Sequence, residues 1–323
     1  MSIAKGSKAR LLIDFESSYG QDPSTKNAIL VPFNSESINA SQNLTEPNTI
    51  RGDLNKVAPI RGNVDVGGDI TIPLDLINIG YWLKALFGAP QTTGTDDGQG
   101  GTTAPYTHVF KVPDSDIPSL VVEKGFTDIG KYFKFSGIKI NSFALGFGGD
   151  GELTASIGVV GKDVTVSGTT YSSSPTKEDF IRFNNFQASV EVNGSVEDAV
   201  TEGNINISTN LDTSIYTLSS GGKRGELPVG MFDVTGSITI FFKDITLLEK
   251  AINGDECSLK VKFIIDDKKS LEFYFPEIIF ERQTPEISGP EGVKVGLNWR
   301  AYFDNNSENT SVKVTLVNDK NGY

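Results

Sequence analysis

The stretch GNVDVGGDITI, residues 62–72, returns further along the chain as GMFDVTGSITI, residues 230–240. In both copies apolar residues alternate with polar ones, which is the pattern of a strand with one buried face. The alternation has the same parity in the two copies, so the repeat is structural and is not an accident of composition. The apolar positions are Val64, Val66, Ile70 and Ile72 in the first copy and Phe232, Val234, Ile238 and Ile240 in the second.

The sequence after each copy also matches. Residues 77–88 and 245–254 each predict a short amphipathic helix that ends at a glycine, Gly88 or Gly254, suited to a left-handed C-cap. Further alternating segments follow both helices, and the many Thr, Val, Ile and Phe residues favour strands. The chain is therefore expected to be mainly β with two short helices.

The sequence supports three further expectations about the order of elements. Each half is expected to open with an alternating strand, residues 36–44 in the first and 185–194 in the second. Residues 91–105, rich in Gly and Thr, predict a flexible loop that has no counterpart in the second half. An Arg-Gly-acid tripeptide precedes each copy of the repeated strand, at residues 51–53 and 224–226, and predicts a turn there.

The length of 323 residues is enough for two domains. The polar segment 162–179 reads as a linker between the repeated halves. The predicted division is a first domain at 1–161 and a second at 180–323.

The formal net charge of −12 disfavours a protein that grips the nucleic-acid backbone, which needs clustered Lys and Arg. It is compatible with a surface that nucleic acid slides past, because like charges lower affinity. The only cysteine, Cys257, allows no intrachain disulfide, and no apolar run suggests a signal peptide or a membrane span. The sequence therefore predicts a protein made in a cytoplasm.

Catalytic chemistry has little support in the sequence. His108 is the only histidine and lies in an alternating segment, where a lone histidine is usually a packing residue. Cys257 has no neighbouring base, and one His with one Cys cannot build a zinc site. We therefore expect no enzyme activity, no catalytic residues, no cofactor and no metal.

Several segments, in order, resemble tail tube proteins of long-tailed bacteriophages. They are FESSYGQDP (15–23), VPFNSESI (31–38), RGDLNKVAPIRGNVDVGGDITIPLD (51–75), GYWLKALFGAP (80–90), SLVVEKGF (119–126) and FGGDGELTASIGVVG (147–161). The resemblance is densest over residues 11–161, and the second half joins it mainly through the internal repeat.

The resemblance implies a β-sandwich or split barrel with a flanking helix in each of two tandem tube domains, with strands that join one ring-wide β-barrel. Rings of this family stack into a hollow tube that carries DNA to the host. A duplicated chain could close a ring of six domains with three subunits, although six chains remain an alternative. The implied partners are further copies of the chain, the tape-measure protein, the tail terminator, and baseplate or tail-tip proteins. The implied location is the virion tail, assembled in the host cytoplasm without membrane insertion.

Strand parity selects candidates for a channel lining. They are Asp65, Asp69, Glu152, Glu191 and Asp233. The alternative is that these side chains are merely solvated. Aromatic residues crowd the first helix, and Tyr81, Trp82 and Phe87 are candidates for a contact between subunits, because Trp and Tyr are favoured at interfaces. The alternative is that this helix only covers its own sandwich.

Two alternative functions remain at this point. One is a monomeric β-sandwich module that binds carbohydrate or acts as an adhesin, which would need an exposed aromatic platform. The other is a baseplate hub protein that uses the same domain in a single ring. Residues 91–105 and the long segment 132–147 are the candidates for contacts between rings.

Overall fold

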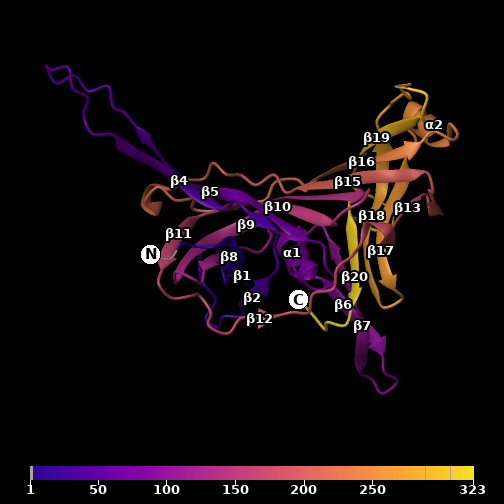
Figure 1. The fold of residues 1–323 in the computed structure, drawn as a ribbon, viewed down its shortest axis with the longest axis horizontal. Coiled ribbons are helices and arrows are strands. Elements are labelled where there is room, and N and C mark those ends of the chain that lie inside the picture. Colours follow the sequence, from indigo (N-terminus) through magenta and orange to yellow (C-terminus); the bar gives the residue numbers. More distant parts are fainter. Residues whose placement is uncertain (1–2, 288, 306) are drawn as a thin grey trace.

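The computed structural model describes residues 3–287, 289–305 and 307–323. The fold is mainly β, as predicted, and its strands form a hydrogen-bonded network that is not closed. Figure 1 shows a broad body, a long arm made by β4 and β5 at one end, and a second projection made by β6 and β7 that points to the bottom of the view.

The strands of the first half are β1 (Ala9–Phe15), β2 (Ile29–Val31), β3 (Ser35–Glu36), β4 (Asn39–Thr45), β5 (Ile60–Pro73), β6 (Gln91–Asp96), β7 (Thr102–Lys111), β8 (Leu120–Phe126), β9 (Lys131–Gly148), β10 (Thr154–Gly161), β11 (Asp163–Ser167) and β12 (Thr176–Lys177). Those of the second half are β13 (Ala188–Val192), β14 (Ser195–Val196), β15 (Val200–Ser208), β16 (Asp233–Phe241), β17 (Cys257–Asp266), β18 (Lys269–Phe280), β19 (Lys294–Ala301) and β20 (Lys313–Asn318). The helices are α1 (Asn78–Phe87) and α2 (Thr246–Asn253), with short 3-10 turns η1 (Gly6–Lys8), η2 (Asn185–Gln187) and η3 (Leu218–Ser220).

One antiparallel sheet runs through both halves of the chain. In the first half the order is β4–β5–β10–β9, and in the second half it is β15–β16–β19–β18. The two runs meet where residues 142–148 of β9 pair with residues 202–208 of β15. We call this eight-strand surface the main sheet.

A second set of strands follows the same plan in each half. The first parts of β9 and β18 leave the main sheet and pair with β8 and β17, respectively, on one side. On the other side they pair with β11 and β20. Strands β1 and β13 complete the two sets by pairing with β8 and β17. The strand pairing of the first half is thus repeated in the second.

The repeated stretch forms β5 and β16, and both predicted helices are present. Val66, Ile70, Val234 and Ile238 are fully buried, as the alternation predicted. The helices end where expected, at Gly88 and Gly254, whose φ angles of 86° and 71° favour glycine.

The second half opens with a strand inside the predicted segment 185–194, as expected, but the expectation that this strand matches the one at 36–44 is wrong. Residues 185–194 form η2 and β13, and β13 pairs with β17 and not with the repeated strand β16. The partner of β16 is β15. Both segments alternate, and alternation identifies a buried face without identifying the neighbouring strand.

The expectation of a flexible loop at residues 91–105 is also wrong. This segment contributes to the β6–β7 hairpin, and β7 continues the pairing onto β20 of the second half. Its threonines favour an extended backbone, and the edge of β20 supplies the hydrogen bonds that hold β7.

A large hydrophobic core lies beneath the main sheet and includes residues of both halves. Phe143 stacks on Phe273 at 6.0 Å between ring centroids, and Phe147 meets Phe263 edge-on at 6.4 Å. These aromatic pairs join β9 of the first half to β18 and β17 of the second. The junction of the halves is therefore packed as a protein interior.

The repeated glycine of the strand has a steric role that can be tested. A Cβ atom at Gly236 would lie 2.2 Å from the carbonyl oxygen of Asn204 and 2.3 Å from the Trp299 ring. Because backbone cannot give way, Gly236→Ala should lower the free energy of unfolding by at least about 2 kcal/mol, measured by denaturant titration. Gly296→Ala, on the neighbouring strand with open space around the added atom, is the matched control and should change stability by less than about 1 kcal/mol. Equal effects of both substitutions would contradict the steric account.

His108 predicts a pH dependence of stability. Its imidazole is fully buried, with Nδ1 2.9 Å from the Thr92 hydroxyl and Nε2 2.9 Å from the carbonyl oxygen of Lys320. Burial lowers the pKa of His108 below its ordinary value of 6.5, so the folded state keeps it neutral when the unfolded chain binds a proton. Stability should fall as pH drops below about 6.5, the ordinary histidine value.

The measurement is chemical denaturation between pH 5 and 8 of the wild-type chain and of His108→Gln. The substitution should flatten the part of the pH dependence that lies just below the histidine value. An unchanged slope in the variant would assign the pH dependence to carboxylates.

Candidate functional site

The outward face of the main sheet is polar across every strand from β4 to β19. One row of register partners crosses five strands: Asp69 lies opposite Gly158, Gly158 opposite Ser142, Ser142 opposite Ser208, and Ser208 opposite Asp233. The two aspartates at the ends of this row come from the first and second copy of the repeat. We call this surface the polar face.

Short uncharged side chains dominate the polar face. Asn204 donates to the Ser237 hydroxyl at 2.6 Å, and Asn206 donates to the amide oxygen of Asn204 at 2.9 Å. Other members are Ser41, Thr71, Ser142, Ser156, Ser208, Thr235, Thr239 and Asn298. Such side chains are polar and carry no net charge.

The charged residues of the polar face have both signs. Asp65 accepts a hydrogen bond from Arg224 Nη2 at 2.5 Å, and Asp233 is paired with Arg300. Lys294 lies over the ring of Phe241, 5.2 Å from its centroid. The face carries paired charges and is not uniformly acidic.

Three of the five predicted lining residues, Asp65, Asp69 and Asp233, lie on the polar face. Glu152 lies two residues before β10, where it pairs with Arg182 at 3.1 Å and accepts from Asn34 at 2.6 Å. The structure does not bring Glu191 to this surface. It lies on β13, in the second set of strands.

Glu191 belongs to a charge cluster on β13, β17 and β18. It lies opposite Lys260, and its carboxylate is 2.8 Å from Lys262 Nζ, while Glu272 is also near both lysines. The hydrogen bond from Lys262 lowers the pKa of Glu191, so the carboxylate stays ionised. This pairing explains Glu191 without a role on the polar face.

The three aromatic residues of α1 are buried within the chain. Trp82 is 1% exposed, and Phe87 stacks on Phe232 of the second half with 6.0 Å between centroids. The Tyr81 ring meets Tyr323 edge-on at 5.1 Å, and its hydroxyl donates to Glu178 at 2.5 Å. Tyr81 and Phe87 therefore contact the second half of their own chain, and a contact with another copy stays a prediction.

Cys257 and His108 were considered for nucleophilic chemistry, and their surroundings do not favour it. Burial raises the pKa of the Cys257 thiol to about 11, so the reactive thiolate does not form at neutral pH. His108 is enclosed by Thr92, Asn318 and the backbone of Lys320. Within residues 3–287, 289–305 and 307–323, no group of three or more His, Cys, Asp or Glu is placed to hold a metal ion.

Sequence reasoning missed the role of Arg224. It read the tripeptide at 224–226 as a turn before a strand, but Arg224 is 5% exposed and anchors a long segment onto the first half. Its Nη1 donates to the carbonyl oxygen of Gly161 at 3.1 Å, while Nη2 reaches Asp65. The near-identity of RGDL and RGEL was the available signal.

Among the residues that the structure describes, the main sheet has two free edges. At one end, β4 pairs with β5 through one of its edges and leaves the other uncovered. At the other end, β18 pairs with β19 only from Ile278 to Phe280. Exposed edges of this kind pair with other strands unless they are protected.

Neither helix in the part of the chain that the structure describes is long and apolar enough to span a membrane. No curated protein gives a significant match to the sequence. A family of phage tail tube proteins matches residues 6–301, which is most of the chain. With its mainly β fold and its open, polar-faced sheet, the chain belongs to the phage tail tube protein family.

Proposed function

We propose that this chain is the ring-forming subunit of a phage tail tube, and that three copies close a ring whose channel is lined by the polar face. The observation that carries the proposal is the junction of β9 and β15. It joins two runs of strands that have the same order, and it leaves the matching edges free at both ends of the chain.

The register supports equivalence of the two runs. Ser41 lies opposite Asp65, and Ser208 lies opposite Asp233, the matching aspartate of the repeat. Thus β4 in the first half takes the position that β15 takes in the second. The partner that β15 finds in β9 is the partner that β4 lacks.

The other free edge supplies that partner in the proposed ring. Residue Val160 of β10 lies opposite Lys139 of β9, and Arg300 of β19 lies opposite Ile279 of β18. Two residues further along, Asn298 of β19 is the counterpart of Gly158 of β10, which lies opposite Ser142. The Glu281 amide donates to the carbonyl oxygen of Asn298, so Glu281 has the position in the second half that Ser142 has in the first. In the proposed ring, β4 of one copy pairs with the segment that begins at Ile279 of the next.

Closure by this pairing would remove both free edges, which is the general advantage of a closed sheet. Three chains would then present six equivalent runs around one axis, as in cyclic assemblies. In this proposal the domains are residues 1–161 and 180–323, joined by 162–179. Tyr81, Trp82 and Phe87 support the contact between runs from within the chain.

The polar face suits a channel for DNA and for the tape-measure protein. Asp69 repels phosphates within about one Debye length, roughly 8 Å at physiological salt, while the arginine partners of Asp65 and Asp233 balance those two charges. The neutral Ser, Thr and Asn side chains keep the surface hydrated. In the proposed virion, rings stack into the tail, which assembles in the host cytoplasm. The terminator and the baseplate or tail-tip proteins bind its two ends.

The test is a cysteine pair placed across the proposed contact between copies, Ser41→Cys with Glu281→Cys. Residues directly opposite on antiparallel strands are close enough for a disulfide. Oxidation should give covalent dimers and trimers on a non-reducing gel, with no species above three chains. The native Cys257 is buried and does not interfere.

The matched control is Ser142→Cys with Ser208→Cys, which places the same pair at the junction inside one chain. It should form an intrachain disulfide in monomers. A ladder that ends at six chains would keep the tube and overturn the three-chain ring. A chain that stays monomeric at high concentration in electron micrographs, with the control disulfide formed, would overturn the proposed function.

A further inference from the structure

Two long connections in the chain match each other in length and in sequence. Residues 42–64 link Ser41 to Asp65, and residues 209–232 link Ser208 to Asp233. Each begins with a similar tripeptide, QNL at 42–44 or TNL at 209–211. Each also contains a similar tetrapeptide, RGDL at 51–54 or RGEL at 224–227. We call these segments the first arm (42–64) and the second arm (209–232).

The second arm is docked on the first half of the chain. Leu211 and Leu227 are buried, and Lys139 Nζ donates to the carbonyl oxygen of Leu227 at 2.9 Å. Arg224 binds Asp65 and the carbonyl oxygen of Gly161. The arm thus attaches through two leucines and one arginine.

The first arm carries the same residue types, but apart from its base, where the Val64 amide donates to the carbonyl oxygen of Gly222 at 2.7 Å, it is undocked. Leu44 is 65% exposed and Leu54 is fully exposed, although their counterparts Leu211 and Leu227 are buried. Arg51 is half exposed and pairs with Asp53, two residues away. In Figure 1 the arm projects from the body at the end opposite the second half. Exposed leucines on a projecting arm indicate a surface that binds another molecule.

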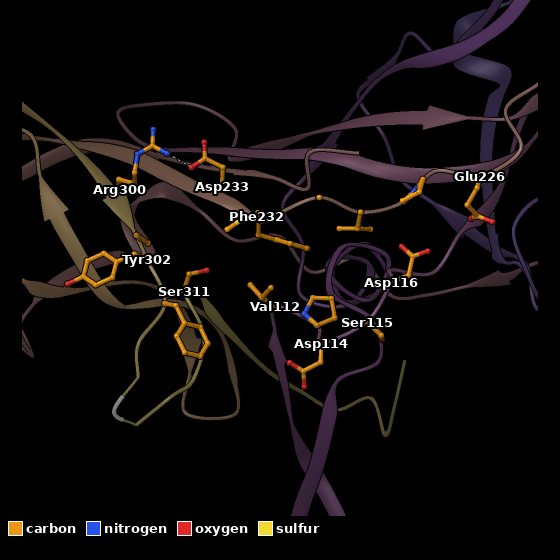
Figure 2. Close-up of a pocket in the computed structure, with 17 residues that line it drawn as sticks. Val112, Asp114, Ser115, Asp116, Glu226, Phe232, Asp233, Arg300, Tyr302 and Ser311 are labelled. Atoms are coloured by element: carbon orange, nitrogen blue, oxygen red, sulfur yellow. Dashed lines mark hydrogen bonds and ion pairs between the residues drawn. The ribbon is translucent and has the colours of Figure 1, made fainter. Parts of the chain in front are cut away.

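A pocket between residues 112–116 of the first half and residues of the second half corresponds to the place where the second arm lies on the first half. It has a volume of about 790 Å³, and Phe232, Asp233, Arg300 and Ala301 are among its lining residues (Figure 2). Asp233 is the repeat counterpart of Asp65. Ala301 lies opposite Val234 as Gly161 lies opposite Val66, so it is the counterpart of Gly161.

The lining of this pocket complements the first arm in chemistry. Figure 2 shows Phe232, Val112 and Tyr302 around it, with the carboxylate of Asp114 at the bottom of the view and that of Asp116 on the right. Of the lining residues, four are acidic (Asp114, Asp116, Glu226 and Asp233) and one, Arg300, is basic. Lys139 adds a second cation beside Asp116 and Glu226. The first arm has three basic and two acidic residues, which are Arg51, Lys56, Arg61, Glu46 and Asp53.

We infer that the first arm of a second copy of this chain fills the pocket, with Leu54 against its apolar lining and Arg51 at Asp233. The inference rests on the proposed ring, in which β4 of one copy lies beside β18 of the next. In that position the first arm of one copy starts beside the second half of the next copy. The second arm starts in the same way beside the first half of its own chain, at the β9–β15 junction. The arm would lock each contact between copies after the strands have paired.

Leu54→Asp tests the apolar contact. Because Leu54 is fully exposed in the single chain, the variant should keep the wild-type melting temperature as a monomer. Its assembly into rings, followed by light scattering and sedimentation, should need at least about tenfold more protein, because a charge would enter an apolar site. Leu218→Asp is the matched control, since Leu218 is equally exposed but lies on the second arm, and it should assemble as the wild type does.

Arg51→Glu tests the ion pair. It should weaken assembly at least about tenfold, since charge-assisted pairs contribute strongly when desolvated. Adding Asp233→Arg should restore part of the loss. Lys56→Glu makes the same charge change on the same arm, five residues away, and should have a smaller effect.

A photo-crosslinking amino acid at position 54 separates this inference from the ring itself. Tagged copies that carry the probe are mixed with untagged copies, and crosslinked peptides are mapped by mass spectrometry. Crosslinks to residues 226–233 or 300–303 of an untagged copy are expected. Rings that form with crosslinks elsewhere would overturn the docking of the arm and leave the proposed function intact. Absence of both crosslinks and rings would overturn both.

Discussion

The hydrogen bonding of β9 to β15 is the constraint on which the rest of the structure depends. Residues 142–148 and 202–208 pair without interruption, and the pairing converts two separate runs of strands into one surface. Because side chains alternate along a strand, the register of this junction decides which residues of the second half share a face with the first. A shift of one residue would turn Asn204 and Asn206 inward and Ile205 and Ile207 outward.

The core beneath the junction holds that register. Phe143 and Phe147 of β9 pack on Phe273 and Phe263, so the strand that joins the halves is fixed from below as well as from its edges. Burial of large aromatic side chains contributes several kcal/mol in total at about 1.5–3 kcal/mol for each fully buried side chain. The halves consequently share one interior, and the polar face keeps its shape as a unit.

The parts of this arrangement that follow from local pattern could be read from the sequence. The alternation of 62–72 and 230–240 gave the correct buried faces of β5 and β16, and the closing glycines gave the ends of α1 and α2. The choice of strand partners could not be read this way. Alternating residues at 185–194 and at 200–208 satisfy the same pattern, and only long-range packing decides that 200–208 lies beside β16.

The candidate site shows the same difference between what a local pattern predicts and what long-range packing decides. Asp65, Asp69 and Asp233 were found because the repeat places them on one face, whereas Glu191 was grouped with them on parity alone and lies in another set of strands. The anchoring of Arg224 depends on a carbonyl oxygen and a carboxylate contributed by segments about 60 and 160 residues away in the sequence. No local pattern encodes such a contact. A repeated tetrapeptide in two arms was the only trace of it in the sequence.

The two halves differ in how completely the single chain covers them. In the first half, Ile79 and Leu86 of α1 are fully buried, and Tyr323 and Phe232 of the second half pack on neighbouring residues of the helix. At matching distances from the closing glycine of α2, Ile245 and Ile252 are about half exposed. Residues of the second half cover the helix of the first half. Within the described chain, the helix of the second half has no matching cover. In the proposed ring, this cover would come from the first half of a neighbouring copy.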